Sequence, residues 1–156
     1  MPRHFRDAGV SFDYPGNWEI TENKALPSGR LIFLEEPGSA IVILTIYGPA
    51  FDVVLEEYVD EFRQSIGSSV PFSLLRHTSF EAKAAGLDCK YSIQLAGIDV
   101  PHTANFTKHV LGENKVVCLT QVADEDRHLV DVGFELIRRT LSTIDPEKPG
   151  RASGSN

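Results

Sequence analysis

Short runs of alternating apolar and polar residues occupy the first third of the chain, and turn residues such as Pro and Gly separate them. Alternation with a period of two is typical of strands that are buried on one face. From Ile41 to Ile46 both parities are apolar, which indicates a strand covered on both faces and therefore near the centre of a sheet. The pattern predicts four strands, at residues 10–14, 18–21, 29–35 and 40–47.

Two segments change to a helical period. After Gly48 and Pro49, Asp52 is placed to cap a helix that runs to about Ile66. The apolar residues of this segment recur at helical spacing and predict an amphipathic helix that lies on a core. A second helix is expected from the acidic run at residues 124–126 to Leu141, because acidic residues suit the start of a helix and basic residues its end.

Four further strands are expected between the two helices. They lie at about residues 72–80, 87–95, 103–111 and 116–123. The connections between them are short and rich in Gly, whereas a parallel crossover needs roughly a dozen residues or more. We therefore expect an antiparallel meander.

The fold class that follows is α+β, with the element order ββββ-α-ββββ-α. We expect an antiparallel sheet of about six to eight strands, with the two main helices on its opposite sides. A single domain is predicted over residues 9–144, after a lead-in at residues 1–8. Residues 145–156 contain almost nothing apolar and are expected to be disordered.

The net charge of the chain disfavours some classes of binding partner. The chain has 156 residues and a formal net charge of −7, which disfavours nucleic acid and anionic lipid as partners. No apolar run approaches the roughly 20 residues that a membrane-spanning helix needs, so membrane insertion is not expected. No secretory signal is visible at the N-terminus, so we expect a cytoplasmic protein.

No catalytic or metal-binding pattern is visible. The five histidines lack HxxxH or HxH spacing, and no GxSxG or phosphate-binding glycine loop occurs. Cys89 and Cys118 fall in apolar strand patterns, where a free buried thiol is expected, although a disulfide between neighbouring strands is an alternative. The paired carboxylates are explained by turns and helix starts. We expect neither an enzyme nor a cofactor.

One group of polar residues stands out in the second half of the predicted sheet. Alternate residues place each set on a single face of its strand. If the two strands align, the sets form a polar surface that no helix covers, which is either a solvated sheet face or a docking surface. The candidate binding residues are Asp88, Lys90, Ser92, Gln94, Thr103, Asn105, Thr107 and His109.

Three features of the chain resemble the PsbP-like superfamily. They are the opening segment from Gly9 to Trp18, the order of strands and helices, and the closing segment, which runs from Lys115 to Thr120 and is followed by a helix ending at Leu141-Ser142. That group includes the photosystem II extrinsic subunit, a Ran-binding factor and DcrB-type bacterial proteins, which have effector-chaperone relatives. The resemblance covers roughly residues 9–144. It implies an antiparallel sheet between helices and a role in binding or assembly, and it supplies no catalytic residue.

We therefore expect a non-enzymatic adaptor or chaperone-like module that binds a protein or peptide, with a homodimer as a further possibility. The alternative is a small-molecule carrier or minor enzyme that uses a pocket between sheet and helix. The shape of the exposed face, flat or concave, separates the two hypotheses.

Overall fold

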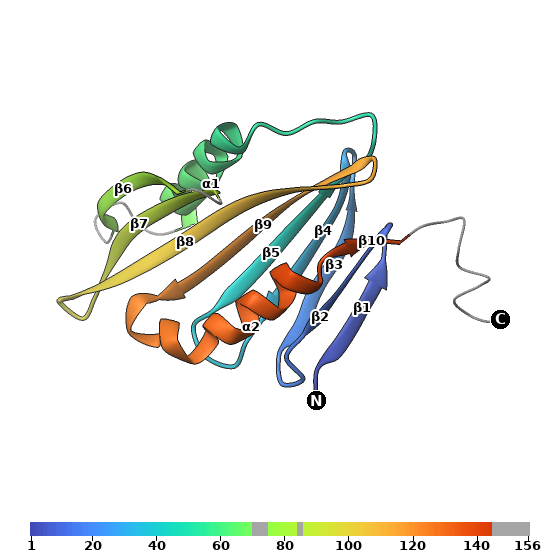
Figure 1. Ribbon diagram of the computed structural model, residues 1–156. Coiled ribbons are helices and arrows are strands. Elements are labelled where there is room, and N and C mark those ends of the chain that lie inside the picture. The colour runs from blue at the N-terminus through green and yellow to red at the C-terminus, as the bar shows by residue number, and fades with distance from the viewer. Residues whose placement is uncertain (70–74, 84–85, 145–156) are drawn as a thin grey trace.

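A computed structural model describes residues 1–69, 75–83 and 86–144 (Figure 1). The fold is α+β, as predicted. The first residues of the predicted strand 72–80 and the predicted disordered tail, residues 145–156, lie outside the described residues. In chain order the elements are β1 (Arg3–Asp7), β2 (Val10–Tyr14), β3 (Glu19–Leu26), β4 (Gly29–Glu35), β5 (Ile41–Tyr47), α1 (Leu55–Ser69), β6 (Leu75–Lys83), β7 (Gly86–Leu95), β8 (Ile98–Leu111), β9 (Asn114–Ala123), the 3-10 helix η2 (Asp124–Asp126), α2 (Arg127–Thr140) and β10 (Ser142–Thr143).

Seven strands form the main sheet, in the order β3-β4-β5-β9-β8-β7-β6. Every neighbouring pair in it is antiparallel, so the predicted meander from β6 to β9 is confirmed. β5 lies between β4 and β9, close to the middle of the sheet. Its buried residues Val42 and Leu44 face one side, and Thr45 faces the other. The interior position expected from its apolar residues is therefore correct.

A second, smaller sheet was not predicted. It has the order β1-β2-β10, so five strands precede α1 instead of the four expected. β1 was missed because Phe5 is its only apolar residue, and it stacks on Phe12 of β2 with ring centroids 4.8 Å apart. The turn between β1 and β2 has positive φ at Ala8 and Gly9, which is the geometry of a tight hairpin.

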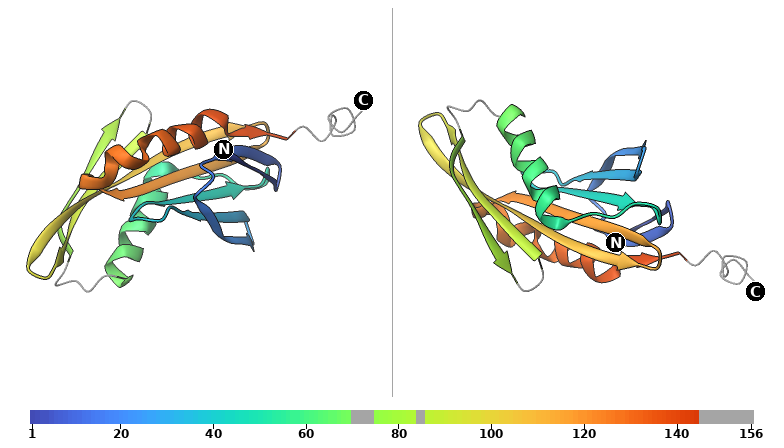
Figure 2. Two further views of the ribbon diagram at one scale, coloured as in Figure 1. Left: turned by 90° about the horizontal axis from the view of Figure 1, so that it is seen from below. Right: turned by 90° about the horizontal axis from the view of Figure 1, so that it is seen from above.

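The two helices cover opposite faces of the main sheet, as expected (Figure 2). Alternate residues of β9 show this directly. Val116 and Cys118 belong to the core that contains Phe134 and Ile137 of α2, whereas Leu119 belongs to the cluster that contains Val59 of α1. The small sheet packs on the same side as α2, since Val10 and Phe12 of β2 share its core.

The turn at residues 15–18 positions α2. Gly133 of α2 lies so close to this turn that an added Cβ would stand 2.5 Å from Cζ2 of Trp18 and 2.9 Å from Cγ of Pro15. Trp18 also meets Phe134 edge to face, with ring centroids 5.7 Å apart. The turn at residues 15–18, which is part of the segment that resembles the PsbP-like superfamily, therefore forms a surface on which α2 packs. No helix among the described residues is both long and apolar enough to span a membrane.

Candidate functional site

The candidate polar residues of β7 and β8 do align. Asp88 lies opposite Asn105, and Lys90 lies opposite Thr103. Asn105 donates a hydrogen bond from Nδ2 to Oδ1 of Asp88 at 2.7 Å. The alignment expected from the alternation is therefore present.

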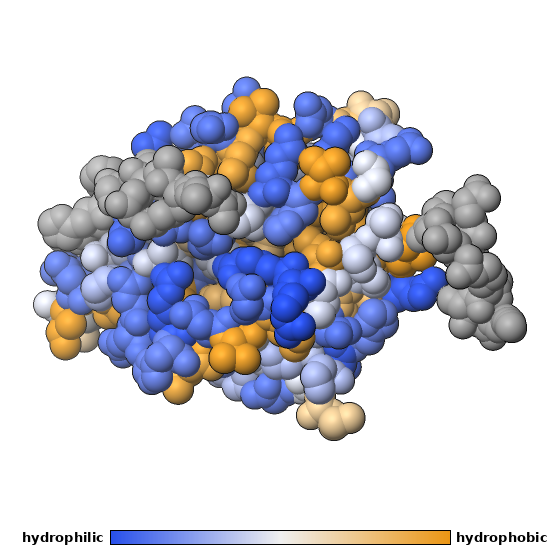
Figure 3. Space-filling model, in the orientation of Figure 1, coloured by the Kyte–Doolittle hydropathy of each residue, from blue (hydrophilic) through white to orange (hydrophobic). Residues whose placement is uncertain are grey.

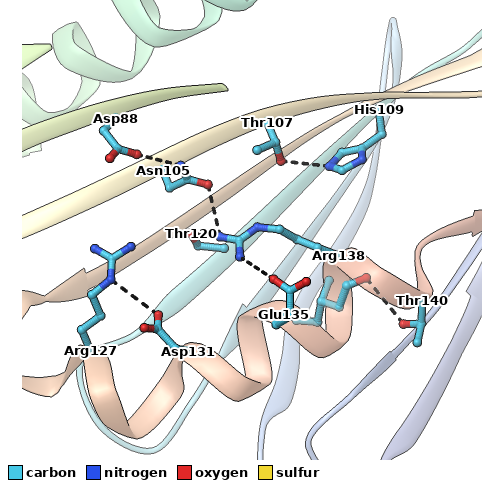
Figure 4. A network of polar contacts seen from close by, with 11 residues as sticks. Asp88, Asn105, Thr107, His109, Thr120, Arg127, Asp131, Glu135, Arg138 and Thr140 are labelled. Atoms are coloured by element: carbon cyan, nitrogen blue, oxygen red, sulfur yellow. Dashed lines mark hydrogen bonds and ion pairs between the residues drawn. The ribbon is translucent and has the colours of Figure 1, made fainter. Parts of the chain in front are cut away.

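The expectation that no helix covers this face is wrong for the part around Asn105. Arg138 of α2 donates from Nη2 to Oδ1 of Asn105 at 3.2 Å and to Oγ1 of Thr120 at 3.1 Å (Figure 4). Asp88 and Thr107 are buried. The cause is the position of β9, which lies next to β8 and carries Thr120 opposite Asn105. Because α2 packs on β9, the long side chain of Arg138 reaches the polar residues of β8.

The first and last candidates on β8, Thr103 and His109, also form hydrogen bonds within the fold. Thr103 is buried and donates to Oδ1 of Asp124 at 2.6 Å. His109 shares a hydrogen bond of 2.9 Å between Nε2 and Oγ1 of Thr107. Burial lowers the pKa of His109, and the positive charge of Arg138 lowers it further. Of the eight candidates, only Lys90 is exposed, while Ser92, Gln94, Asn105 and His109 are half-buried.

A different surface is open. On the face that carries α1, the helix packs against β7 and β8, and β3 and β4 project beyond it in both views of Figure 2. A groove of about 390 Å³ lies between α1 and the uncovered half of the sheet. We call it the α1 groove, and its lining residues are Leu26, Ser28, Leu31, Ile43, Thr45, Tyr47, Tyr58, Glu61, Phe62, Ser65 and Leu119.

The floor of the α1 groove is apolar and only half-buried. Leu31, Ile43 and Tyr47 retain partial exposure, and Phe33 of β4 shares the same face with the same partial exposure. At the helix side, Thr45 and Tyr58 share a hydrogen bond of 2.8 Å between their hydroxyl oxygens. Burial raises the pKa of Tyr58 to about 12, so this hydroxyl stays neutral.

The rim of the α1 groove is acidic. Glu57 and Glu61 of α1 are exposed, and neither forms an ion pair with another described residue. A smaller hollow of about 230 Å³ adjoins the groove and is lined by both carboxylates together with Tyr47 and Tyr58. The pKa of Tyr47 is raised, first by burial and then by the negative charge of Glu61. The groove therefore presents uncompensated negative charge beside an apolar floor.

Sequence reasoning missed this groove, although a signal was present. From Leu31 to Leu34 the chain is apolar at both parities, as it is in β5. Such a strand needs cover on both faces. With only two helices predicted, one of which packs on the opposite side, one face of β4 had nothing to cover it.

The described residues carry no arrangement typical of catalysis. They contain no cluster of three or more His, Cys, Asp or Glu that could hold a metal ion. Cys89 and Cys118 are both free and buried, and burial raises the pKa of each thiol to about 11. They belong to the two separate clusters on opposite faces of the sheet, which excludes the alternative of a disulfide between them.

Comparison with known proteins supports the fold and little beyond it. No model of a protein family matches the sequence, and no curated protein matches it at the sequence level. Among solved structures, the Ran-binding protein Mog1p of Saccharomyces cerevisiae is similar over 94% of this chain and 97% of its own, with 8% identity and a TM-score of 0.54.

Two further solved structures are similar over most of the chain. CyanoP, the PsbP of Synechocystis sp. PCC 6803, covers 92% of each chain at 11% identity with a TM-score of 0.45. LpqN of Mycobacterium tuberculosis, involved in cell envelope biogenesis, covers 93% of this chain and 90% of its own at 12% identity, also with a TM-score of 0.45. The chain has the PsbP-like fold, as its sequence resemblance implied.

Proposed function

We propose that this chain is a non-enzymatic protein-binding module, and that it holds an apolar segment of a partner protein in the α1 groove. The observation that carries the proposal is that β4 and β5, together with Leu26 of β3, present an apolar surface that α1 leaves uncovered. Contiguous exposed apolar surface in a folded domain often marks an interaction site. The binding role that the fold resemblance implies, and the Ran binding named for Mog1p, agree with this class of function.

The dimensions of the groove favour a helix as the bound segment. Three neighbouring strands span roughly 10 Å between the outer two, and a helix with its side chains is about 10–12 Å wide. A single helix beside α1 would therefore complete the layer that α1 begins. Amphipathic helices commonly bind in apolar grooves in this way.

The rim charges define the chemistry of the partner further. Because Glu57 and Glu61 lack a cationic partner among the described residues, a segment with Lys or Arg beside its apolar face fits best. We therefore propose a basic amphipathic helix as the ligand. An acidic segment would place like charges against the rim.

The test uses a matched pair of apolar-to-acidic variants. Leu31→Glu puts a charge on the groove floor, where Lys24 lies opposite and can accommodate it. Ile98→Glu makes the same change at an exposed position, the first residue of β8. Partners are recovered from an extract of the source cells on each tagged protein and quantified by mass spectrometry.

We expect Leu31→Glu to reduce recovery of the specific partner at least about tenfold, a loss of roughly 1.4 kcal/mol of binding free energy. Ile98→Glu should leave recovery unchanged, and both variants should melt near the wild-type temperature. Equal recovery on Leu31→Glu and wild type would show that the groove is not the binding surface.

The volume of the α1 groove also falls within the range of small-molecule sites, which is roughly 300–1,000 Å³. This keeps the carrier or minor enzyme as a second candidate. A broad ligand screen by thermal shift separates the two, because a ligand that binds only the folded state raises the melting temperature with concentration. The polar set around Lys90, Ser92 and Gln94 is the alternative contact surface if the α1 groove does not bind the partner.

A further inference from the structure

The outward face of α2 carries large apolar side chains where a surface helix is normally polar. Leu129 and Val132 are 71% and 82% exposed, and apart from Met1 no described large apolar residue exceeds Val132. Leu136 continues the stripe and is half-buried. The inner face of the helix already packs on the core, where Val130 and Phe134 are buried. Figure 3 shows apolar patches among hydrophilic side chains on the face where α2 lies.

The charges beside this stripe are arranged symmetrically about Val132. Glu125, in the 3-10 helix η2 that leads into α2, precedes Val132 by seven residues, and Arg139 follows Val132 by seven residues within α2. Both charged residues are exposed, and neither forms an ion pair with another described residue.

Their neighbours in sequence are already engaged in the fold. Asp124 accepts a hydrogen bond from Thr103, and Asp126 accepts one from Ser39. Arg138 is bound to Asn105 and Thr120. Glu125 and Arg139 are thus the acidic and basic groups that remain available at the two ends of the stripe.

We propose that this face of α2 binds the same face of a second copy of the chain, with the two helices antiparallel and the two-fold axis at Val132. In this arrangement Val132 meets its own counterpart, and Leu129 lies near Leu136 of the other copy. Glu125, just before α2 in each copy, then lies near Arg139 in the last turn of α2 of the other copy. The surface is self-complementary in shape and charge, as a two-fold interface requires.

The proposal is independent of the partner-binding role of the α1 groove. α2 and α1 cover opposite faces of the sheet, so pairing through α2 leaves both grooves of the dimer open. Such a dimer would offer two binding sites to a bivalent partner. A contact of one helix pair is smaller than a standard protein interface, so the dimer is expected to be weak and concentration-dependent.

Charge reversal tests the geometry. Sedimentation equilibrium over a range from micromolar to millimolar protein gives the dissociation constant of the dimer. Glu125→Arg and Arg139→Glu should each raise this constant at least about tenfold, because each places two like-charged pairs across the interface. An equimolar mixture of the two single variants should recover dimers, since each then supplies the charges that the other lacks.

The double variant Glu125→Arg with Arg139→Glu should likewise dimerise as the wild type does. Leu31→Glu, in the α1 groove, should leave the dimer intact and so separates this proposal from the groove. A wild-type chain that stays monomeric over the whole range would overturn the proposal. Dimers that are unaffected by either single reversal, or a mixture that does not recover them, would overturn it equally.

Discussion

Arg138 of α2 and Asn105 of β8 are joined by a hydrogen bond of 3.2 Å from Nη2 to Oδ1. This contact makes the polar face of β8 an internal junction between helix and sheet. Asn105 is bound on both sides, because it also donates to Asp88. Its amide is therefore a structural link, and an Asn105→Ala variant would report on stability before it reported on binding.

Arg138→Met should destabilise the fold by about 2 kcal/mol. The substitution keeps much of the apolar stem but removes the donor for Asn105 and Thr120, and hydrogen bonds to charged groups contribute roughly 1.5–3 kcal/mol. Urea denaturation measures the change.

Arg127→Met is the matched control on the same helix. Arg127 forms an exposed pair with Asp131 at 3.5 Å, four residues away. Pairs of this kind contribute about 0.3–0.5 kcal/mol. Equal effects of the two substitutions would show that the junction at Arg138 contributes no more than a surface pair.

Gly133→Ala should destabilise the chain by about 1 kcal/mol or more, although the same change in an exposed helix gains up to about 1 kcal/mol. The new methyl group would meet the buried ring of Trp18, and forcing extra volume into a packed site costs about 1–3 kcal/mol. Thermal unfolding followed by circular dichroism measures the net result. A higher melting temperature would contradict the close packing of α2 on the turn at residues 15–18.

His109 should make the fold less stable as the pH falls. Its folded pKa is lowered, so below the ordinary histidine pKa of about 6.5 the unfolded chain binds a proton that the folded chain resists. Stability is therefore complete above about pH 6.5 and declines as the pH falls towards the lowered folded value.

The comparison with His109→Gln isolates this contribution, because Gln can still hydrogen-bond to Thr107 and does not titrate. Between about pH 7.5 and pH 5.5, the wild type should lose more stability in urea denaturation than the variant does. Parallel pH profiles would show that His109 is protonated equally in both states.

Neither cysteine should react in the folded protein. Both thiols are buried, and their raised pKa values of about 11 leave little thiolate near neutral pH. With Ellman's reagent, we expect no rapid reaction of the native chain and two thiols per chain after unfolding in guanidinium. A fast thiol in the native state would indicate that one of the two strands opens readily.

The strong features of the fold were predictable because each rests on a repeated local pattern. The apolar residues on both parities of β5 placed it inside the sheet, and the helical spacing from Leu55 to Phe62 defined α1. β1 was not predictable in this way, since its burial depends on one side chain, Phe5, and on a turn with positive φ at Ala8.

The candidate site was harder to predict, because periodicity assigns residues to a face but does not say which element covers that face. The polar residues around Asn105 looked exposed in sequence, yet α2 crosses them through Arg138. The sequence analysis did not say which element covers the apolar residues around Leu31, and α1 leaves them open. Cover by a distant helix is a tertiary property, and periodicity alone did not determine it at either place.

Photo-crosslinking in the source cells tests the binding surface most directly. Benzoylphenylalanine replaces Leu31 in the α1 groove or, in a separate variant, Lys90 on the polar face. We expect irradiation to join a discrete partner to the chain from position 31 and not from position 90. An adduct from position 90 alone, or none from position 31, would contradict binding in the groove beside α1.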